Sequence, residues 1–201
     1  MKPPASIGQR LEQVDTPALV LELEAFERNL KTLADLAHGR VRVRAHAKTS
    51  KCPEVGKRQM ALGAVGVCCQ KVAEAEAMVE GGIMDVLVSN EVVGAAKIER
   101  LAQLARRAKV GVCVDDAGKV KDLEAAARAT GAKLDAYVEL EVGMGRCGVA
   151  PGEPALALAR VVAACANLRF AGLQAYNGRA QHVRSSEDRR ALIGKADCGR
   201  V

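Results

Sequence analysis

Polar side chains that can take part in catalysis follow the short apolar segments of this sequence. They are His46 and Lys48, Gln70, Ser89, Asn90 and Glu91, Asp115 and Asp116, Glu141 and Arg146, and then Tyr176, Asn177, Arg179 and His182. Lys48 offers the most specific chemistry, because an amine whose pKa is lowered by burial or by nearby cations can form a Schiff base. Arg44, His46 and Lys51 are the cations close to it in the sequence. The alternative is a solvated lysine on a basic loop.

Arg146 lies in the glycine-rich segment Gly143-Met-Gly-Arg-Cys-Gly148. Glycine lets the backbone approach a flat ligand closely, and the guanidinium can donate hydrogen bonds to an oxygen anion. The sequence therefore makes Arg146 a candidate ligand-binding residue. The alternative is a turn arginine that forms an ion pair with Glu139 or Glu141.

Tyr176 and His182 form a third candidate group. Tyr176 ends an apolar segment in a chain with only two Tyr and two Phe, and it can either flank a planar cofactor or simply pack at the rim of the fold. His182 can serve as a general base near neutral pH, or it can be a solvated loop residue. Asp115 and Asp116 are expected to cap the helix that follows them.

The elements that position these residues alternate regularly along the chain. Apolar spacing predicts a helix over residues 23–38, preceded at 16–23 by an apolar segment rich in β formers. Short apolar segments that predict strands lie at 41–44, 64–69, 85–88, 110–114, 134–141 and 168–175. Helical segments lie between them at 53–62, 71–80, 94–108, 117–130 and 153–166. This alternation is typical of βαβ units and a parallel sheet.

Two α/β architectures fit this pattern, an open doubly wound sheet and a (β/α)8 TIM-type barrel. Both bind ligands at the carboxyl ends of the strands. The only GxGxxG segment is 143–148, and Pro151 and Gly152 interrupt an immediate helix after it, so it is a weak dinucleotide signature. About six βα units are present, so on the barrel interpretation the barrel is incomplete.

Composition excludes several classes of protein. Hydrophobic residues make up 49% of the chain and charged residues 27%, which is typical of a globular protein. No apolar run approaches the ~18 residues needed to span a bilayer. The net charge is +6, but the scarcity of aromatic residues argues against nucleic-acid binding. Seven cysteines without a CxxC pair and a polar N-terminus predict a cytoplasmic protein with reduced thiols and no membrane partner.

Several segments together carry a family resemblance. They are Thr16-Pro-Ala-Leu-Val-Leu21, His46-Ala-Lys-Thr49, Gly63-Ala-Val-Gly-Val-Cys-Cys-Gln-Lys71, Ser89-Asn-Glu-Val-Val93, Gly143-Met-Gly-Arg-Cys-Gly148 and Phe170-Ala-Gly-Leu-Gln-Ala-Tyr176. In this order they resemble the D-threonine aldolase and D-serine dehydratase-like family of pyridoxal-phosphate enzymes. The stretch from Ala175 to His182 is most similar to the D-threonine and 3-hydroxy-D-aspartate aldolases. The resemblance covers residues 16–196.

The resemblance implies a barrel of the alanine racemase N-terminal type and a role for five residues. Lys48 would form the Schiff base with pyridoxal 5'-phosphate, and Arg146 would contact the phenolic oxygen side of the cofactor. Tyr176 would lie beside the cofactor ring, with Gln70 as a polar contact in the same pocket. His182 would act on the β-hydroxyl group of a small D-amino acid substrate. The implied reaction cleaves the Cα–Cβ bond to give glycine and an aldehyde.

The resemblance also implies features that this sequence does not contain. We expect residues 1–15 to be a loose lead-in and residues 16–201 to be part of the cofactor-binding barrel, without the family's C-terminal β domain. The ligands of the family's divalent metal would lie in that missing part, so none is assigned here, and the activity of the chain as written would be impaired. A complete chain is expected to be a homodimer. D-Serine dehydration, amino-acid racemisation and a non-catalytic cofactor-binding barrel remain alternatives.

Overall fold

The computed structural model describes residues 5–195 of the chain. They form two compact units, of which the first ends at Val41 and the second begins at Arg42. The first unit contains the 3-10 helix η1 (Leu11–Gln13) and the helix α1 (Leu23–Ala37). No helix in the described part of the chain is long and apolar enough to cross a lipid bilayer.

α1 confirms the helix predicted in the first unit. It begins where the carboxylate of Glu22 accepts hydrogen bonds from the backbone N–H groups of Glu24 and Ala25, which satisfies donors that a helix N-terminus leaves free. The apolar segment at 16–22 has a composition typical of a strand but forms none. A strand needs a hydrogen-bonded partner, and β-forming residues alone do not supply one.

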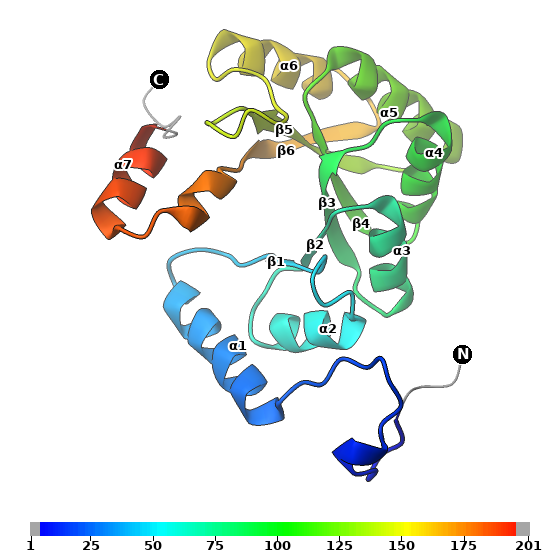
Figure 1. The fold of residues 1–201 in the computed structure, drawn as a ribbon. Coiled ribbons are helices and arrows are strands. Elements are labelled where there is room, and N and C mark those ends of the chain that lie inside the picture. Colours follow the sequence, from blue (N-terminus) through cyan, green and yellow to red (C-terminus); the bar gives the residue numbers. More distant parts are fainter. Residues whose placement is uncertain (1–4, 196–201) are drawn as a thin grey trace. The chain divides into compact units, whose positions relative to one another are not determined.

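The second unit alternates strands and helices along the chain (Figure 1). Its strands are β1 (Ala45–His46), β2 (Val67–Cys69), β3 (Asp85–Glu91), β4 (Lys109–Val114), β5 (Leu134–Leu140) and β6 (Leu168–Ala175). Its helices are α2 (Pro53–Ala61), α3 (Val72–Glu80), α4 (Ala95–Leu104), α5 (Ala117–Thr130), α6 (Glu153–Ala163) and α7 (Ser186–Lys195), with the 3-10 helix η2 (Gly178–His182) before α7. The predicted alternation is confirmed.

The strand order distinguishes the two architectures that the sequence left open. All six strands are parallel, and each pairs with the strand before it in the sequence, in the order β1-β2-β3-β4-β5-β6. A doubly wound sheet reverses its strand order at a switch point, whereas a (β/α) barrel adds strands in sequence. The second unit therefore has the strand order of the barrel class, with six of its strands present.

Several predicted boundaries were wrong by three residues or more. β2 begins at Val67 and not at 64, β3 ends at Glu91 and not at 88, and α6 ends at Ala163 and not at 166. The first strand was expected at 41–44 but lies at Ala45–His46. A backbone hydrogen bond from Val65 N to Val43 O at 2.9 Å links the predicted segment to the residues before β2. The helix predicted over 94–108 ends at Leu104, because the residues after it turn toward β4. An alternation of valines does not show at which residue a strand begins to pair with its neighbour. Helical spacing that continues past a helix does not show at which residue the helix ends.

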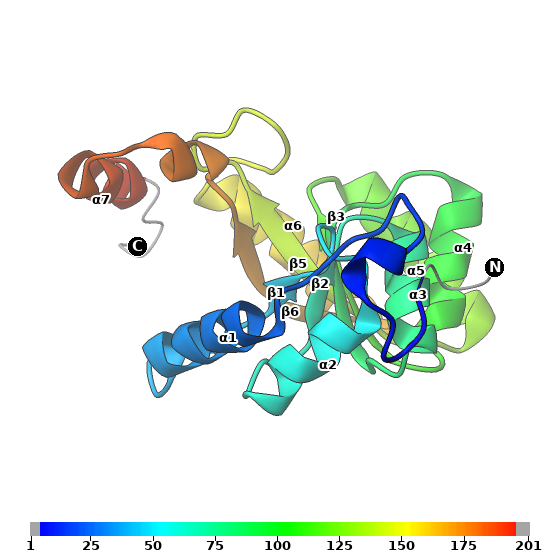
Figure 2. The same ribbon diagram turned by 60° about the horizontal axis from the view of Figure 1, so that its bottom comes forward.

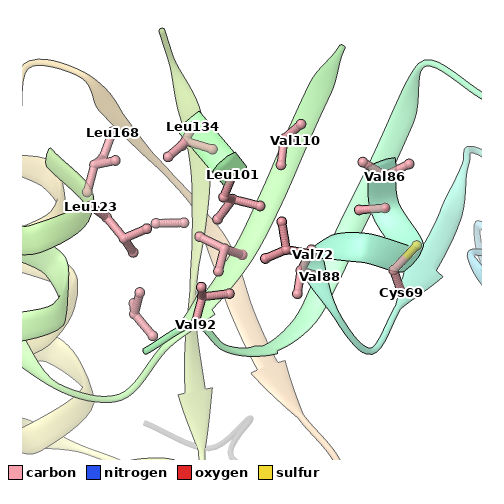
Figure 3. Packing of buried hydrophobic residues seen from close by; sticks show 14 of the residues in the cluster. Cys69, Val72, Val86, Val88, Val92, Leu101, Val110, Leu123, Leu134 and Leu168 are labelled. Atoms are coloured by element: carbon pink, nitrogen blue, oxygen red, sulfur yellow. The ribbon is translucent and has the colours of Figure 1, made fainter. Parts of the chain in front are cut away.

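One set of alternate strand residues packs against helices α3–α6 and forms the core. The strand residues include Val86, Val88, Val110, Val112, Val114, Leu134, Ala136 and Val138, and the helix residues include Met78, Leu101, Leu123 and Val162. Figure 3 shows Val88, Val110 and Leu134 of the strands beside Leu101 and Leu123 of the helices. Removal of this apolar surface from water stabilises the fold, at about 25 cal/mol per Å².

The residues between these core positions point to the opposite face of the sheet, because side chains alternate along a strand. Toward the carboxyl ends of the strands this face carries polar groups, namely Ser89, Cys113, Tyr137 and Glu139. We call these four residues the polar face. In a closed barrel this face lines the interior, and it is where the strands bring functional groups together.

An ion-paired network lies at the opposite, amino-terminal ends of the strands. The Asp85 carboxylate receives Arg44 Nη1 at 2.8 Å on one oxygen and Lys109 Nζ at 2.9 Å on the other. Burial raises the pKa of Asp85, but the hydrogen bonds from Arg44 and Lys109 outweigh it, and the pKa lies below its ordinary value. The network therefore joins the chain just before β1 to β3 and β4.

We expect Asp85→Asn to lower the free energy of unfolding by about 1–3 kcal/mol, the range for a hydrogen bond to a charged partner. Because the folded pKa of Asp85 is lowered, its contribution is present above its unfolded value of about 3.9 and is lost as the pH falls through the folded value. Urea unfolding of the natural protein and the variant should thus differ near neutral pH and converge in acid. Equal stability at neutral pH would contradict the assigned ion pairs.

Candidate active site

The carboxyl ends of the six parallel strands meet at one edge of the sheet, and every predicted site residue follows a strand at that edge. Lys48 follows β1, Gln70 follows β2, Arg146 follows β5, and Tyr176 and His182 follow β6. This is the edge at which α/β proteins bind ligands. The local structure of each residue determines what it can do there.

Lys48 lies in a tight turn after β1, and its side chain is exposed. The turn is fixed by buried Ala47, whose backbone N–H donates to the carbonyl of Cys68 at 2.7 Å, and the backbone N–H of Lys48 lies 3.3 Å from His46 Nδ1. Within residues 5–195 the Lys48 amine has no ion pair or hydrogen bond. Lys51, in contrast, lies 3.9 Å from the Glu74 carboxylate. The Lys48 amine is therefore available to a ligand.

His46 connects the Lys48 turn to the polar face. Its Nε2 atom lies 3.4 Å from Ser89 Oγ. Burial and, next, the positive charge of Lys48 lower the pKa of His46. A neutral imidazole at this position adds no positive charge beside the amine, and it can exchange a hydrogen bond with the serine hydroxyl.

Gln70 is half-buried between β2 and α3. Its backbone N–H donates to the Glu74 carboxylate at 2.8 Å, and its carbonyl accepts from Asn90 Nδ2 at 3.5 Å. The side chain lines a hollow of about 330 Å³ together with Lys71, Asn90 and other residues of the loops after β2 and β3. This hollow offers polar contacts to a ligand at the carboxyl edge.

The glycine-rich turn that carries Arg146 is built around the carboxylate of Glu141. That carboxylate accepts backbone N–H groups from Gly143 at 2.5 Å, Gly145 at 2.6 Å and Arg146 at 3.1 Å. The hydrogen bond from Gly143 is the largest cause that lowers the pKa of Glu141. At Gly148 the φ angle is +104°, and a Cβ atom would lie 2.6 Å from the Glu141 nitrogen. Only glycine fits there, so the turn is fixed at both ends.

Arg146 and Tyr176 lie together, although 30 residues of sequence separate them. The Arg146 guanidinium carbon lies 5.2 Å from the centroid of the Tyr176 ring, a cation–π distance. Arg146 Nη2 also lies 3.6 Å from Glu139 Oε1. Both alternatives drawn from the sequence are thus present, because the arginine pairs with a glutamate and lies against the candidate cofactor-flanking tyrosine.

His182 is the last residue of η2 and is exposed. Asn177 caps η2 by accepting the backbone N–H of Arg179 at 3.2 Å, and Gln181 Nε2 donates to the Tyr176 hydroxyl at 2.9 Å. The imidazole of His182 makes no hydrogen bond within the described chain. The structure brings Arg146 and Tyr176 into contact, whereas within residues 5–195 no hydrogen bond, ion pair or cation–π contact joins His182 or Lys48 to that pair.

The sequence treated Asp115 and Asp116 alike, but the structure separates them. Asp116 caps α5 by accepting the backbone N–H of Lys119 at 2.9 Å, as expected. Asp115 instead accepts the backbone N–H of Gly148 at 3.1 Å and so supports the Arg146 turn. Ligand atoms of Glu91, Asp115 and Cys147 lie within 4.8 Å of one another. Burial, followed by the hydrogen bond to Glu91, raises the pKa of the Cys147 thiol, so a protonated thiol faces two carboxyl groups.

Buried Glu139 was missed as a site residue in its own right. The sequence considered it only as a possible ion-pair partner of Arg146, although it stands in the apolar segment 134–140. Its side chain is 4% exposed. A charged residue between the apolar residues Val138 and Leu140 was the available signal, because such a residue is rarely buried unless it has a partner.

Comparison with known protein families identifies the family of this chain. Residues 21–193 match the model of the alanine racemase N-terminal domain. The chain belongs to that family. The match includes all six strands and the residues Lys48, Gln70, Arg146, Tyr176 and His182.

Individual members of the family are similar over nearly the whole chain. The chain is 49% identical over 197 residues to D-threonine aldolase of an Arthrobacter species, and covers 52% of that protein. It is 49% identical over 197 residues to 3-hydroxy-D-aspartate aldolase of Paracoccus denitrificans, and covers 51% of it. The crystal structure of D-threonine aldolase from Filomicrobium marinum matches with a TM-score of 0.94 and 58% identity, over 98% of this chain and 53% of that one. The chain thus spans about half the length of these relatives.

Proposed function

We propose that this chain is the cofactor-binding part of a pyridoxal-phosphate-dependent lyase acting on D-β-hydroxy amino acids. The reaction cleaves the Cα–Cβ bond and gives glycine and an aldehyde. The proposal is carried by the Lys48 amine, which has no partner within the described residues, at the same strand edge as an arginine packed on a tyrosine ring. The chain is also 49% identical to each of two D-specific aldolases.

The chemistry of these side chains fits pyridoxal 5'-phosphate. The aldehyde of the cofactor requires a primary amine, and the Lys48 amine has no competing carboxylate within the described residues. The ring requires a flat apolar neighbour, which Tyr176 offers. The phenolic oxygen requires a cationic donor, and Arg146 retains unused N–H groups because its ion pair with Glu139 is long, at 3.6 Å. When bound, pyridoxal phosphate supplies the electron sink that makes bonds to the substrate's α-carbon labile.

The residues of this chain would bind the cofactor, orient it and accept a proton from the substrate. Lys48 would hold the cofactor through its amine, and Arg146 and Tyr176 would orient the cofactor ring. Gln70 provides a polar contact in the same pocket. His182 takes the proton from the substrate's β-hydroxyl group as the Cα–Cβ bond breaks, which is general base catalysis.

The metal and the partners that we propose are inferred from the family resemblance. A divalent metal is expected in the whole enzyme, with ligands outside the residues assigned here, and it would help to polarise the β-hydroxyl group. The partners are a small-molecule D-amino acid and a second copy of the same protein, with no nucleic acid or membrane. A cytoplasmic location is consistent with the free cysteines of the described chain.

Product analysis of the natural protein tests the reaction. Supplied with pyridoxal phosphate and a divalent metal, it should convert D-threonine to glycine and acetaldehyde and leave L-threonine unchanged. With 3-hydroxy-D-aspartate it should release glycine and glyoxylate. Release of ammonia and a keto acid would instead indicate a dehydratase, and interconversion of D- and L-amino acids would indicate a racemase. Either result would overturn the lyase assignment.

We expect Arg146→Ala to weaken pyridoxal phosphate binding about ten-fold or more, because a hydrogen bond to a charged group contributes about 1.5–3 kcal/mol. Equilibrium titration of the cofactor-free natural protein measures the change. Arg169→Ala is the matched control, since Arg169 is also ion-paired to an acid of β5, Asp135, but at the other end of the strand. Unchanged affinity in the Arg146 variant would leave Arg146 as a turn residue.

A further inference from the structure

Glu139 is a buried charged residue to which the proposed function assigns no role. It is 3% exposed, in a strand whose neighbouring residues are apolar. Its Oε2 atom is buried without a hydrogen-bond partner in the described part of the chain. A buried carboxylate oxygen without a hydrogen-bond partner costs stability. Such a cost is typical of a residue retained for a functional reason.

The groups around Glu139 differ in their effect on its charge. Burial is the largest influence and raises the pKa of Glu139, and the negative charges of Glu91 and Asp115 act in the same direction. The hydrogen bond with Cys113 and the positive charge of Arg146 lower it, but the pKa remains above its ordinary value. Among the described residues, Arg146 is the cation that acts on this carboxyl group.

Glu139 and Glu141, at the same end of β5, contact different parts of Arg146. Glu141 holds the backbone of the turn, including the N–H of Arg146 itself at 3.1 Å. The guanidinium is not fixed by that bond, because several rotatable bonds separate it from the backbone. Within residues 5–195 it contacts the Glu139 carboxylate, the Tyr176 ring and the uncharged thiol of Cys147. Glu139 is thus the charged contact that selects a direction for the guanidinium.

We propose that Glu139 is a positioning residue, whose carboxylate holds the Arg146 guanidinium against the Tyr176 ring in the orientation that binds the cofactor's phenolic oxygen. The inference rests on the proposed function of Arg146. It adds a buried residue that never touches the cofactor yet determines how strongly Arg146 binds it. The length of the ion pair, 3.6 Å, suits this role, because the guanidinium is directed while N–H groups remain for the ligand.

A purely structural role makes a different prediction for the uncharged variant Glu139→Gln. Glutamine keeps the shape of the side chain, and loss of the charge removes both the desolvation cost and the repulsion from Glu91 and Asp115. Stability of the cofactor-free protein should therefore stay the same or increase. The positioning role predicts that cofactor binding weakens nevertheless, because the guanidinium loses its directing charge.

The experiment measures cofactor affinity and unfolding of the natural protein in a double-mutant cycle of Glu139→Gln and Arg146→Ala. We expect Glu139→Gln to raise the dissociation constant of pyridoxal phosphate about ten-fold, a difference of about 1.4 kcal/mol, with an unfolding midpoint no lower than that of the parent. In the Arg146→Ala background the same change should have no further effect, because coupled residues are not additive. Glu139→Asp, which keeps the charge but shortens its reach, should also weaken binding and replaces the Gln variant should that fail to fold.

Asp135→Asn is the matched control. Asp135 lies on the same strand, is 8% exposed and pairs with Arg169, so this variant should lose stability and keep its cofactor affinity. Two results would overturn the inference without affecting the role of Arg146. One is an unchanged cofactor affinity in Glu139→Gln, and the other is an equal loss of affinity from Glu139→Gln in the parent and in the Arg146→Ala variant. If Arg146→Ala alone changes nothing, or the parent binds no pyridoxal phosphate, the proposed function fails and the inference fails with it.

Discussion

Replacement of Lys48 by alanine is expected to reduce aldol cleavage by the natural protein to the background rate. The reason is that the proposed function assigns covalent attachment of the cofactor to the Lys48 amine alone. Because the Lys48 side chain is exposed and makes no hydrogen bond within the described residues, the fold should be unaffected. Turnover of D-threonine and the unfolding midpoint, measured on the same preparation, separate the two effects.

Covalent labelling checks the same assignment without relying on activity. After incubation of the natural protein with pyridoxal phosphate and reduction with borohydride, the mass of the reduced cofactor should appear on the peptide that contains Lys48. Lys51 and Lys71 are the matched controls because they are near in sequence and are also amines, but Lys51 is held by Glu74 at 3.9 Å. Label on either control residue, or full turnover by Lys48→Ala, would remove the central assignment.

The strands of the second half were predictable because their apolar residues are distinctive. The segments at 110–114, 134–141 and 168–175 match β4, β5 and β6 within one residue at each end. Each contains β-branched or aromatic residues and is followed or preceded by a clear helix. β1 was misplaced because it has only two residues, and a two-residue strand has no period that a sequence can display.

The candidate site was predictable to the extent that chemistry shows in residue type. Lys48, Arg146 and Tyr176 stand out because an amine, a guanidinium and a phenol follow apolar segments, and their roles then came from the family resemblance. What the sequence could not supply is which side chains meet. The contact of Arg146 with the Tyr176 ring depends on the neighbouring positions of β5 and β6, which only the folded sheet provides.

Glu139 and Asp115 are two residues of the site whose roles could not be predicted from the sequence. Glu139 alternates with apolar residues in the same manner as a solvent-exposed strand residue, and the sequence does not indicate whether the face it occupies is covered. Asp115 has the residue type of a helix cap, yet its carboxylate reaches the backbone of Gly148, 33 residues later. Asp115 reaches the Arg146 turn from the end of the neighbouring strand β4, whereas Glu139 reaches Arg146 from β5, the strand that leads into the turn.

The segment after β6 determines whether His182 can act on the substrate. Its position is linked to the cofactor side of the site, because Gln181 donates to the Tyr176 hydroxyl at 2.9 Å. At Gly178 a Cβ atom would lie 2.7 Å from the same hydroxyl oxygen, so the segment must pass close to Tyr176. A histidine one residue after Gln181 is therefore carried by the same short helix that contacts the ring-flanking tyrosine.

We expect His182→Asn to lower the rate of aldol cleavage by about 10²–10⁴-fold, the usual contribution of a positioned general base. Cofactor affinity and the unfolding midpoint should stay unchanged, because the imidazole makes no hydrogen bond within the described chain. Steady-state kinetics with D-threonine, together with cofactor titration and thermal unfolding, make these measurements.

The matched control is His38→Asn, since His38 is the residue that follows α1 in the first unit and has no assigned role. It should retain full activity. If His182→Asn cleaves D-threonine at the parent rate, the proton of the β-hydroxyl group must leave by another route, and His46 beside Ser89 on the polar face is the next candidate. Loss of cofactor together with activity would instead indicate that His182 maintains the position of Tyr176. The combination of rate, cofactor affinity and unfolding midpoint thus distinguishes a proton acceptor from a residue that only supports the cofactor pocket.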